Sequence, residues 1–381
     1  MTTDVKDADL KSADLTGADL TGADLTGADL TDVDVTHAEP QQTVSAVAAS
    51  STRHTVTMQR AIVMALARAL EDDPTTLVFG EDVGKLGGVF RATDGLQAQF
   101  GPNRVFDTPL AESAIMGMAV GLAMNGWRPV AEIQFDGFSY PAVDQIVNQV
   151  ARMRNRSRGA FSMPITLRLP SFGGINAPEH HGESMESLYA HVPGLKVVAP
   201  STPAEAYRLL RQAIADPDPV IFMEPKARYW HKGVVDTADA TPDLPVGTSR
   251  VVREGKHVTL IAWGAMVARC LQAADLGAED GVEIEVLDLR WLKPIDAAGL
   301  AASVSRTGRA VVVHEAPLTA GLGAEVVALL MRDSFGALKA PVGRVAGYDV
   351  PYPSQSLEER YLPSIDRILS AVQETLEYRR G

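Results

Sequence analysis

The sequence has little of what would direct a chain to an oxidising compartment or a membrane. It contains a single cysteine, Cys270, among 381 residues, which excludes an intrachain disulfide framework and fits a reducing compartment. No apolar run has the length needed to cross a bilayer, and the polar N-terminus lacks the hydrophobic region of a signal peptide. These absences predict a cytoplasmic protein with no membrane partner.

Basic patches and nucleotide-binding motifs are also missing. The net charge is -13, and the sequence shows no basic stripe of the kind that binds nucleic acid. It has no P-loop and no Gly-x-Gly-x-x-Gly. Nucleic acid is therefore not an expected partner, and neither of these two nucleotide-binding motifs is available to suggest a ligand.

The acidic charge is concentrated in residues 1–39, which carry ten acids and two lysines and so supply -8 of the total. The tripeptide Ala-Asp-Leu recurs there every five residues, five times between Ala8 and Leu30. This spacing is similar to the pentapeptide-repeat family, whose coils stack into a square β-helix. Five units make little more than one four-sided turn, whereas a solenoid needs roughly three or more stacked turns to bury its inner face. We therefore expect residues 1–52 to be a disordered tail and linker, in preference to a docked coil.

The remainder of the sequence alternates short apolar runs with helical segments, and 46% of all residues are hydrophobic, enough for two cores. This alternation predicts an α/β fold. A break is expected across residues 232–247, where Pro242 and Pro245 lie among polar residues. The predicted strands are 76–82, 128–133, 164–169, 195–198, 220–223, 258–263, 283–288 and 310–313. The predicted helices are 58–70, 114–124, 144–154, a segment reaching about residue 278, one between residues 288 and 310, and 323–332.

The stretch from Asp107 to Gln145 is the most informative part of the chain. Glu112 precedes a run of small and apolar residues that reads as a helix closed by Asn125 and Gly126, and an acid is favoured at such a helix start. Gly117 and Gly121 fall on one helical face, which predicts close approach of another helix. Considered alone, Glu112 is more often an ordinary first-turn acid.

Several segments together resemble a known family. Glu112 with Gly117-Met118-Ala119-Val120-Gly121 resembles the E-x4-G-Φ-x-x-G pattern of thiamine-diphosphate enzymes. The order of further matching segments over roughly residues 55–378 resembles the β subunit of the E1 component of 2-oxo acid dehydrogenases. The segments are 132–135, 144–148, 163–166, His181, 193–198, 222–226 and 287–290.

This resemblance implies a fold of two domains. A transketolase-like pyrimidine-binding domain, a parallel sheet flanked by helices, is expected at residues 53–240. A transketolase C-terminal α/β domain is expected at residues 248–381. In this family the second domain carries no cofactor chemistry and helps to dock the acyltransferase core.

The resemblance also implies the site. Glu112 matches the glutamate that hydrogen-bonds the aminopyrimidine ring of thiamine diphosphate, where a carboxylate forms a strong charge-assisted bond. Phe138 matches the aromatic side chain that stacks on this ring, and Leu110 matches a nearby backbone contact. Phe138 alone would be assigned to the core.

Histidines are the remaining candidates for chemistry. His181 matches a loop histidine at the mouth of the family's active site, and an imidazole can exchange a proton near neutral pH during acyl transfer to a lipoyl group. The pair His180-His181 also admits a zinc site, although no ligand set of cysteines or acids accompanies it. His191 is expected to be a structural loop residue.

One absence gains meaning from the resemblance. Thiamine-diphosphate enzymes hold Mg2+ and the diphosphate with a Gly-Asp-Gly motif, which this chain lacks. The implied partner is an E1 α subunit that holds Mg2+, in an α2β2 assembly with thiamine diphosphate shared between the chains and activity only when both are present. The E2 lipoyl acyltransferase core and a small 2-oxo acid are the other implied partners. Asp216, with neighbouring carbonyl groups, resembles the residues that form a structural monovalent-cation site, for example for K+, in some relatives.

The resemblance indicates the preferred 2-oxo acid less clearly than it indicates the family. Residues 222–226 and Pro141 are similar to branched-chain 2-oxo acid dehydrogenases, and several pyruvate enzymes carry a proton-relaying glutamate where this chain has Pro141. Residues 163–169 are equally similar to bacterial pyruvate dehydrogenase β subunits. The branched-chain type (EC 1.2.4.4) is favoured, with pyruvate (EC 1.2.4.1) or acetoin dehydrogenase as the alternative. A third hypothesis, an acidic pentapeptide-repeat binding protein, leaves about 330 residues unexplained.

Overall fold

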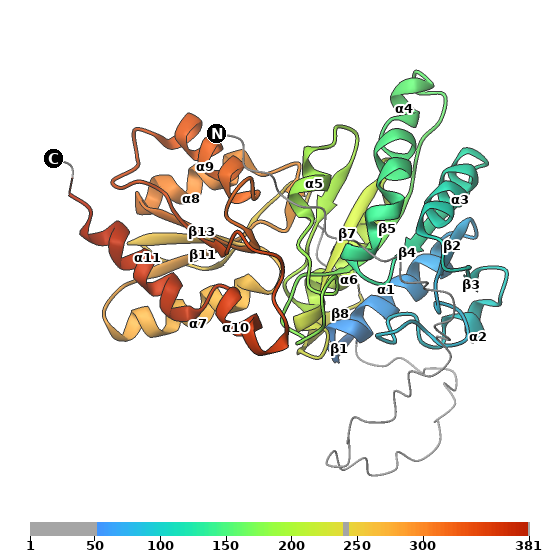
Figure 1. Ribbon diagram of the computed structural model, residues 1–381, viewed down its shortest axis with the longest axis horizontal. Coiled ribbons are helices and arrows are strands. Elements are labelled where there is room, and N and C mark those ends of the chain that lie inside the picture. The colour runs from blue at the N-terminus through green and yellow to red at the C-terminus, as the bar shows by residue number, and fades with distance from the viewer. Residues whose placement is uncertain (1–51, 239–243, 380–381) are drawn as a thin grey trace, which may run out of the picture. The chain divides into compact units, whose positions relative to one another are not determined.

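Two sheets, each covered by helices, organise the computed structural model, which describes residues 52–238 and 244–379 (Figure 1). The described residues belong to one compact unit. We call residues 53–236 the first lobe and residues 250–377 the second lobe. The N-terminal repeat, predicted to be a disordered tail, lies outside the described residues.

The elements of the first lobe follow one another in a regular alternation. They are β1 (Arg53–Thr57), α1 (Met58–Asp72), β2 (Thr76–Gly80), α2 (Leu96–Phe100), β3 (Val105–Asp107), α3 (Glu112–Met124), β4 (Arg128–Glu132), η1 (Asp136–Ala142), η2 (Gln145–Val150), α4 (Met153–Arg156), β5 (Thr166–Ser171), α5 (Glu186–His191), β6 (Lys196–Val198), α6 (Pro203–Ala215), β7 (Val220–Pro225), η3 (Lys226–Arg228) and β8 (Lys232–Asp236).

The second lobe repeats this pattern with fewer strands. Its elements are β9 (Arg250–Arg253), β10 (Val258–Ala262), α7 (Met266–Glu279), β11 (Ile284–Asp288), β12 (Trp291–Lys293), α8 (Ala297–Thr307), β13 (Ala310–Pro317), α9 (Gly323–Ser334), β14 (Gly343–Gly347), η4 (Gln355–Leu357), α10 (Glu358–Tyr361) and α11 (Ile365–Glu377).

Seven strands form the first sheet, in the order β12-β6-β7-β5-β4-β2-β3, and all pairs are parallel except β12 with β6. The strands β2, β5 and β7 are buried along their whole length, as expected for a parallel sheet covered on both faces. Helices α1 and α6 cover one face, and α3 with η1 and η2 covers the other. Gly80 of β2 pairs with Asp107 of β3 and with Glu132 of β4, which aligns three strand ends at one edge.

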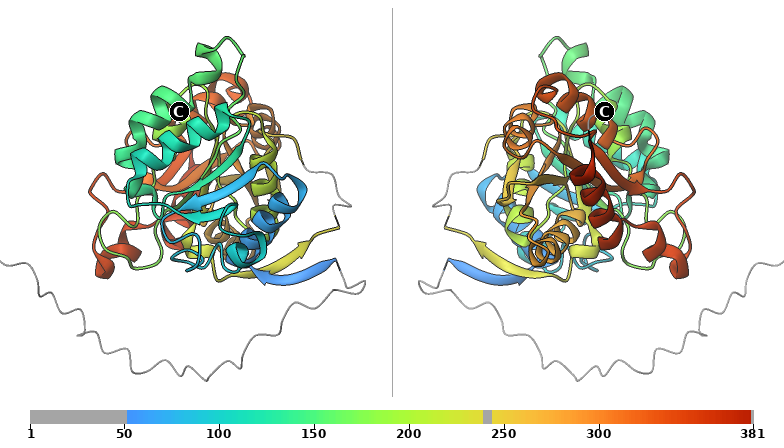
Figure 2. Two further views of the ribbon diagram at one scale, coloured as in Figure 1. Left: turned by 90° about the vertical axis from the view of Figure 1, so that its right-hand side faces the viewer. Right: turned by 90° about the vertical axis from the view of Figure 1, so that its left-hand side faces the viewer.

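The second sheet has five strands, in the order β14-β13-β10-β11-β9, and only β9 runs antiparallel to its neighbour. The turned views in Figure 2 show helices on both faces of the sheets. Two separate cores were expected, yet one apolar cluster continues across both lobes and includes Leu167, Leu195, Ile261 and Leu300. The lobes are thus joined by packed side chains as well as by the chain.

Most predicted strands and helices are confirmed, with three differences. The helix expected at residues 144–154 is divided into the π-helical turn η2 and the short α4. The expected break at residues 232–247 begins with strand β8, which pairs antiparallel with β1. β12 follows the predicted boundary at residue 248, yet it joins the sheet of the first lobe through β6. The two strand differences come from pairing partners distant in sequence.

Candidate active site

Two carboxyl groups meet at the aligned strand ends of the first sheet. Glu81 follows β2 directly, and Glu112 is the first residue of α3. The Glu81 side chain is buried and its Oε1 has no hydrogen-bond partner. Burial, together with smaller contributions from the charges of Glu112, Asp82 and Glu132, raises the pKa of Glu81 to about 7. The part-buried Glu112 therefore lies close enough to Glu81 for their charges to interact.

A buried ion network supports the sheet beside these acids. Arg168 of β5, which is 0% exposed, donates from Nε to Glu224 Oε1 at 2.6 Å and from Nη1 to Glu132 Oε2 at 2.5 Å. Tyr229 Oη donates to Glu224 Oε2 at 2.6 Å. Sequence analysis missed this network, although an arginine inside the apolar run of residues 164–169 was the signal, since a fully buried arginine needs anionic partners.

Aromatic rings line the adjacent wall. The ring centroids of Phe135 and Phe138 lie 5.1 Å apart, and the imidazole of His181 lies 4.4 Å from Phe135 and 4.9 Å from Phe138. All three contacts are edge-to-face, which is a favoured geometry for aromatic pairs. Phe138 is only partly buried, so its ring is not fully enclosed by this chain. The structure thus brings the predicted residues Phe138 and His181 into one cluster.

His181 is positioned by the loop that follows β5. Its Nδ1 lies 2.9 Å from the backbone carbonyl oxygen of Glu179, and its amide N donates to Pro178 O at 3.2 Å. The neighbouring His180 side chain is exposed and its Nδ1 lies 3.9 Å from Glu183 Oε1. The two imidazoles therefore have different neighbours. Within the described ranges no group of three or more His, Cys, Asp or Glu side chains is arranged to hold a metal ion.

The side of the site formed by α3 is open. Leu110, immediately before this helix, is 80% exposed. A Cβ atom built at Gly121 would meet no described atom within 4 Å, and one at Gly117 would meet only Gln145 Oε1 at 3.8 Å. The helix approach predicted for this face is made at Gly117 only by the side chain of Gln145 of η2, and at Gly121 by no described residue of this chain.

A buried acid and a buried lysine lie behind the aromatic cluster. Asp136 is 0% exposed and Lys226 is 1% exposed. Burial raises the pKa of Asp136 to about 7 and lowers that of Lys226 to about 8, while each opposes the shift of the other through its charge. Lys226 Nζ also lies 5.5 Å from the centre of the Phe135 ring. Neither residue was identified as a site residue from the sequence, although Lys226 ends the matching segment 222–226.

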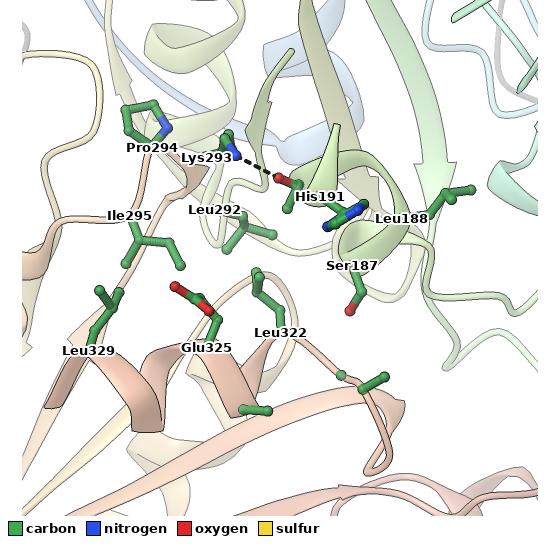
Figure 3. Close-up of a pocket in the computed structure, with 14 residues that line it drawn as sticks. Ser187, Leu188, His191, Leu292, Lys293, Pro294, Ile295, Leu322, Glu325 and Leu329 are labelled. Carbon is green, nitrogen blue, oxygen red and sulfur yellow. Dashed lines mark hydrogen bonds between the residues drawn. The ribbon is translucent and has the colours of Figure 1, made fainter. Parts of the chain in front are cut away.

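The remaining candidates lie elsewhere. The Asp216 carboxylate accepts two hydrogen bonds of 2.7 Å from Lys196 Nζ, and its cation role stays a prediction. His191 was expected in a loop, but it is the last residue of helix α5. With Lys293 and Glu325 it lines a cavity of about 860 Å³ (Figure 3). Lys293 Nζ donates to Ala190 O at 2.8 Å there. This cavity is lined by none of the residues predicted for cofactor binding.

Comparison with protein families defines the class. Residues 54–231 match the transketolase pyrimidine-binding domain, and residues 247–368 match the transketolase C-terminal domain. The protein thus has the transketolase-like two-domain α/β fold. Pentapeptide repeats match residues 5–39 in eight copies, three more than the five units counted from the sequence.

Relatives then define the family. The chain is 53% identical to the pyruvate dehydrogenase E1 component subunit beta of Leifsonia xyli subsp. xyli, over 84% of this chain and 95% of that protein. It is 52% identical to the 3-methyl-2-oxobutanoate dehydrogenase subunit beta of Mycobacterium tuberculosis, over 89% and 97%. It is 47% identical to the pyruvate dehydrogenase E1 component subunit beta of Bacillus subtilis, over 85% and 99%. The chain belongs to the E1 β subunits of 2-oxo acid dehydrogenases, a thiamine-diphosphate-dependent family.

A solved structure carries the same fold. A split-gene transketolase, described as an inactive β4 tetramer, superposes with a TM-score of 0.69 at 27% identity and covers 86% of this chain and 100% of its own. No helix in the described part of the chain is long and apolar enough to cross a membrane.

Proposed function

We propose that this chain is the β subunit of a branched-chain 2-oxo acid dehydrogenase E1. With an α subunit it decarboxylates the 2-oxo acid oxidatively and transfers the acyl group to the lipoyl groups of an E2 acyltransferase. The observation that carries the proposal is the arrangement of the first lobe, where Glu112 begins α3 at the aligned strand ends and α3 packs against η1, which carries Phe138 beside His181.

The residues fit an aminopyrimidine ring. Glu112 is a part-buried carboxylate at a helix start, and Phe138 presents a partly uncovered ring. Thiamine diphosphate, when bound, supplies the nucleophilic carbon that attacks the 2-oxo group. Glu112 would hold a protonated ring nitrogen through a charge-assisted bond, Phe138 would stack on the ring, and the Leu110 backbone would contact it. The unpartnered Oε1 of Glu81, near Glu112, adds a polar group that a ligand or water can satisfy.

His181 has a different task in this proposal. Its ring is half-buried against Phe135 and Phe138, and the backbone oxygen of Glu179 lies within hydrogen-bond distance of Nδ1. If Nδ1 donates that bond, Nε2 is left to exchange a proton as the S–S bond of the dithiolane opens during acyl transfer. The ring would thereby serve the second half-reaction more than the first.

An α subunit supplies the rest of the site. This chain has no Gly-Asp-Gly motif, so we propose that the α chain holds Mg2+ and the diphosphate in an α2β2 assembly. The open face of α3, with Leu110 exposed, supports contact with another chain. Asp216 would take part in a K+ site only after Lys196 moves, because Lys196 now occupies both carboxylate oxygens.

Substrate preference is proposed from two residues and two relatives. Pro141 of η1 has no carboxylate and cannot relay protons, whereas several pyruvate enzymes are expected to carry a proton-relaying glutamate at this position. Relatives of both substrate types match almost equally, at 53% and 52% identity, so pyruvate, and acetoin among related substrates, is the alternative.

The purified α–β complex should be assayed with a panel of branched-chain 2-oxo acids, pyruvate and acetoin. The highest kcat/KM is expected for a branched-chain acid, and a higher value for pyruvate would reverse the assignment. The β chain alone should show neither turnover nor micromolar binding of Mg2+-thiamine diphosphate by calorimetry.

A further inference from the structure

The loop that carries His181 satisfies only part of its backbone through its own hydrogen bonds, which include Phe172 N to Glu183 O and His181 N to Pro178 O. In residues 172–183, here called the His181 loop, Phe172, Gly174, Asn176 and His180 have φ values of +69°, +86°, +54° and +68°. Such left-handed positions interrupt any regular ladder of hydrogen bonds. Buried amides in the loop must therefore find partners elsewhere.

Two carboxylates of the second lobe supply those partners. Glu358, the first residue of α10, accepts hydrogen bonds from Gly174 N at 2.9 Å and Asn176 N at 2.7 Å. Glu315 of β13 accepts one from Gly173 N at 2.8 Å. Glu358 is 1% exposed and Glu315 is 3% exposed. Hydrogen bonds to ionised acceptors are roughly twice as strong as neutral ones, so these contacts fix the start of the loop.

A tyrosine of the second lobe fixes the other end. Tyr352 donates its hydroxyl to Glu358 Oε1 and packs against two glycines of the loop. A Cβ atom added at Gly173 would lie 1.8 Å from Tyr352 Oη, and one at Gly182 would lie 2.3 Å from Tyr352 Cε1. Gly182 follows His181 directly, so the ring of Tyr352 limits how far that residue can move.

The opposite side of the loop meets η1. A Cβ atom at Gly137 would lie 2.2 Å from the backbone oxygen of His180, so the two backbones are in close contact. The loop is therefore held between the second lobe and the element that carries Phe138. His181 is directed at Phe135 and Phe138 from this position.

We infer that Glu358, supported by Tyr352, is a positioning residue that holds the His181 loop and so sets the imidazole of His181 for acyl transfer. The inference rests on the role proposed above for His181. It gives the second lobe a part in catalysis, in addition to the docking of the acyltransferase core that the family resemblance implies. Because misplacement by about 1 Å can cost about 10²-fold in rate, loosening one end of the loop is expected to be measurable.

The test compares Glu358→Ala, Glu358→Gln and Tyr352→Phe in the assembled α–β complex. Glu358→Ala should reduce acyl transfer to lipoylated E2 by about tenfold or more and change decarboxylation, measured with an artificial electron acceptor, by less than about twofold. Glu358→Gln keeps one acceptor oxygen and should lose less, as should Tyr352→Phe. Hydrogen exchange of residues 173–182 should accelerate in all three variants.

Glu359→Ala is the matched control, because the neighbouring Glu359 is 74% exposed in its side chain and pairs with Arg269 on the surface. It should leave both half-reactions and the exchange of the loop unchanged.

A double variant separates the inference from the proposed function. If Glu358 acts through His181, His181→Ala with Glu358→Ala should be no slower in acyl transfer than His181→Ala alone. If the losses of acyl transfer in the two single variants multiply in the double variant, Glu358 does not act through His181. That result, or an equal loss in both half-reactions for Glu358→Gln, would overturn the positioning role and leave the proposed function standing. Unchanged acyl transfer in His181→Ala would overturn the proposed role of the histidine and, with it, this inference.

Discussion

The two lobes share one architecture but use buried charge differently. In the first lobe, Arg168 is enclosed with two carboxylates, and Glu81 has an oxygen without a partner. In the second lobe, Glu285 accepts from Thr259 Oγ1 and from Ser303 Oγ and pairs with Arg306, whose side chain is 52% exposed. Helix-covered parallel sheets are common to both. The first lobe also contains three acids, Glu81, Asp136 and Glu186, that have raised pKa values and a carboxyl oxygen without a hydrogen-bond partner.

The first lobe is where the candidate site lies. Perturbed acids cluster at functional sites because catalysis requires groups that burial alone would disfavour. Glu81, Asp136 and Glu186 have pKa values raised to about 7, 7 and 8, and burial is the main cause for each. In the second lobe burial also raises the pKa of Asp288, to about 7, and that of Glu315, but both carboxyl groups accept hydrogen bonds, and Glu315 and Glu358 accept theirs from the backbone of the first lobe.

The largest effect is expected for Glu112→Ala in the α–β complex. Loss of a positioned proton-transfer partner typically costs 10²- to 10⁴-fold, so decarboxylation should fall by about this factor. Assembly, measured by size-exclusion chromatography, should be unchanged. Glu71→Ala, at an exposed acid of α1, is the control. A variant that kept more than about a third of the wild-type rate would show that Glu112 is the wrong residue.

The free energy of unfolding should respond unequally to loss of the buried Arg168 and of the half-exposed Arg306. Arg168→Met leaves Glu132 and Glu224 without their cation and should lower the free energy of unfolding by about 3–5 kcal/mol. Arg306→Met should cost about 1 kcal/mol or less, since its side chain is half exposed and hydroxyl donors to Glu285 remain. Urea midpoints at one protein concentration measure both. Equal costs would mean that the lobes do not differ in this respect.

His181→Ala should separate the two half-reactions. Acyl transfer to lipoylated E2 should fall by about tenfold or more, since a single proton-transfer group contributes roughly 10²- to 10⁴-fold, and decarboxylation should change by less than about twofold. His180→Ala, at the exposed neighbouring imidazole, is the control. Equal losses in both assays would indicate that His181 binds the 2-oxo acid, and no loss in either would make it an ordinary loop residue.

Glu81→Gln should change how stability depends on pH. The Glu81 pKa is about 7 in the folded chain and 4.5 ordinarily, so the folded state holds the proton more tightly. As pH rises from 4.5 to 7, the unfolded chain loses this proton first, and the folded state loses stability. Glutamine stays neutral, so the variant should melt higher than wild type at pH 8 and equally at pH 4.5. Glu71→Gln, at an exposed acid of α1 that does not contribute to the Glu81 pKa shift, is the control.

Removal of residues 1–50 should have the smallest effect. Even eight pentapeptide copies would make only two four-sided coils, fewer than the roughly three stacked coils that a solenoid needs. Melting temperature and turnover of the truncated complex should equal those of the full chain. A drop of several degrees would show that the repeat stabilises the rest of the protein.

Local patterns predicted much of the fold. Helical periodicity identified α1, and apolar runs identified most of the strands that form the two sheets. Helix α6 was missed, although Thr202 followed by Pro203 is a helix-start signal. β12 could not be predicted, because its three residues pair with β6 almost a hundred positions earlier. Short strands have no periodicity of their own.

The sequence alone was enough for the α/β class, most strands of the two sheets, the place of Glu112 at a helix start, and the lack of a motif for Mg2+ and diphosphate. These follow from local chemistry, since periodicity, caps and short motifs act over a few residues. Only the tertiary structure decided which groups lose water together. It buried Arg168 between two acids, raised the pKa of Glu81, and placed Glu358 of the second lobe against the loop of His181. Burial and close contact join residues far apart in the chain, and no local pattern encodes them.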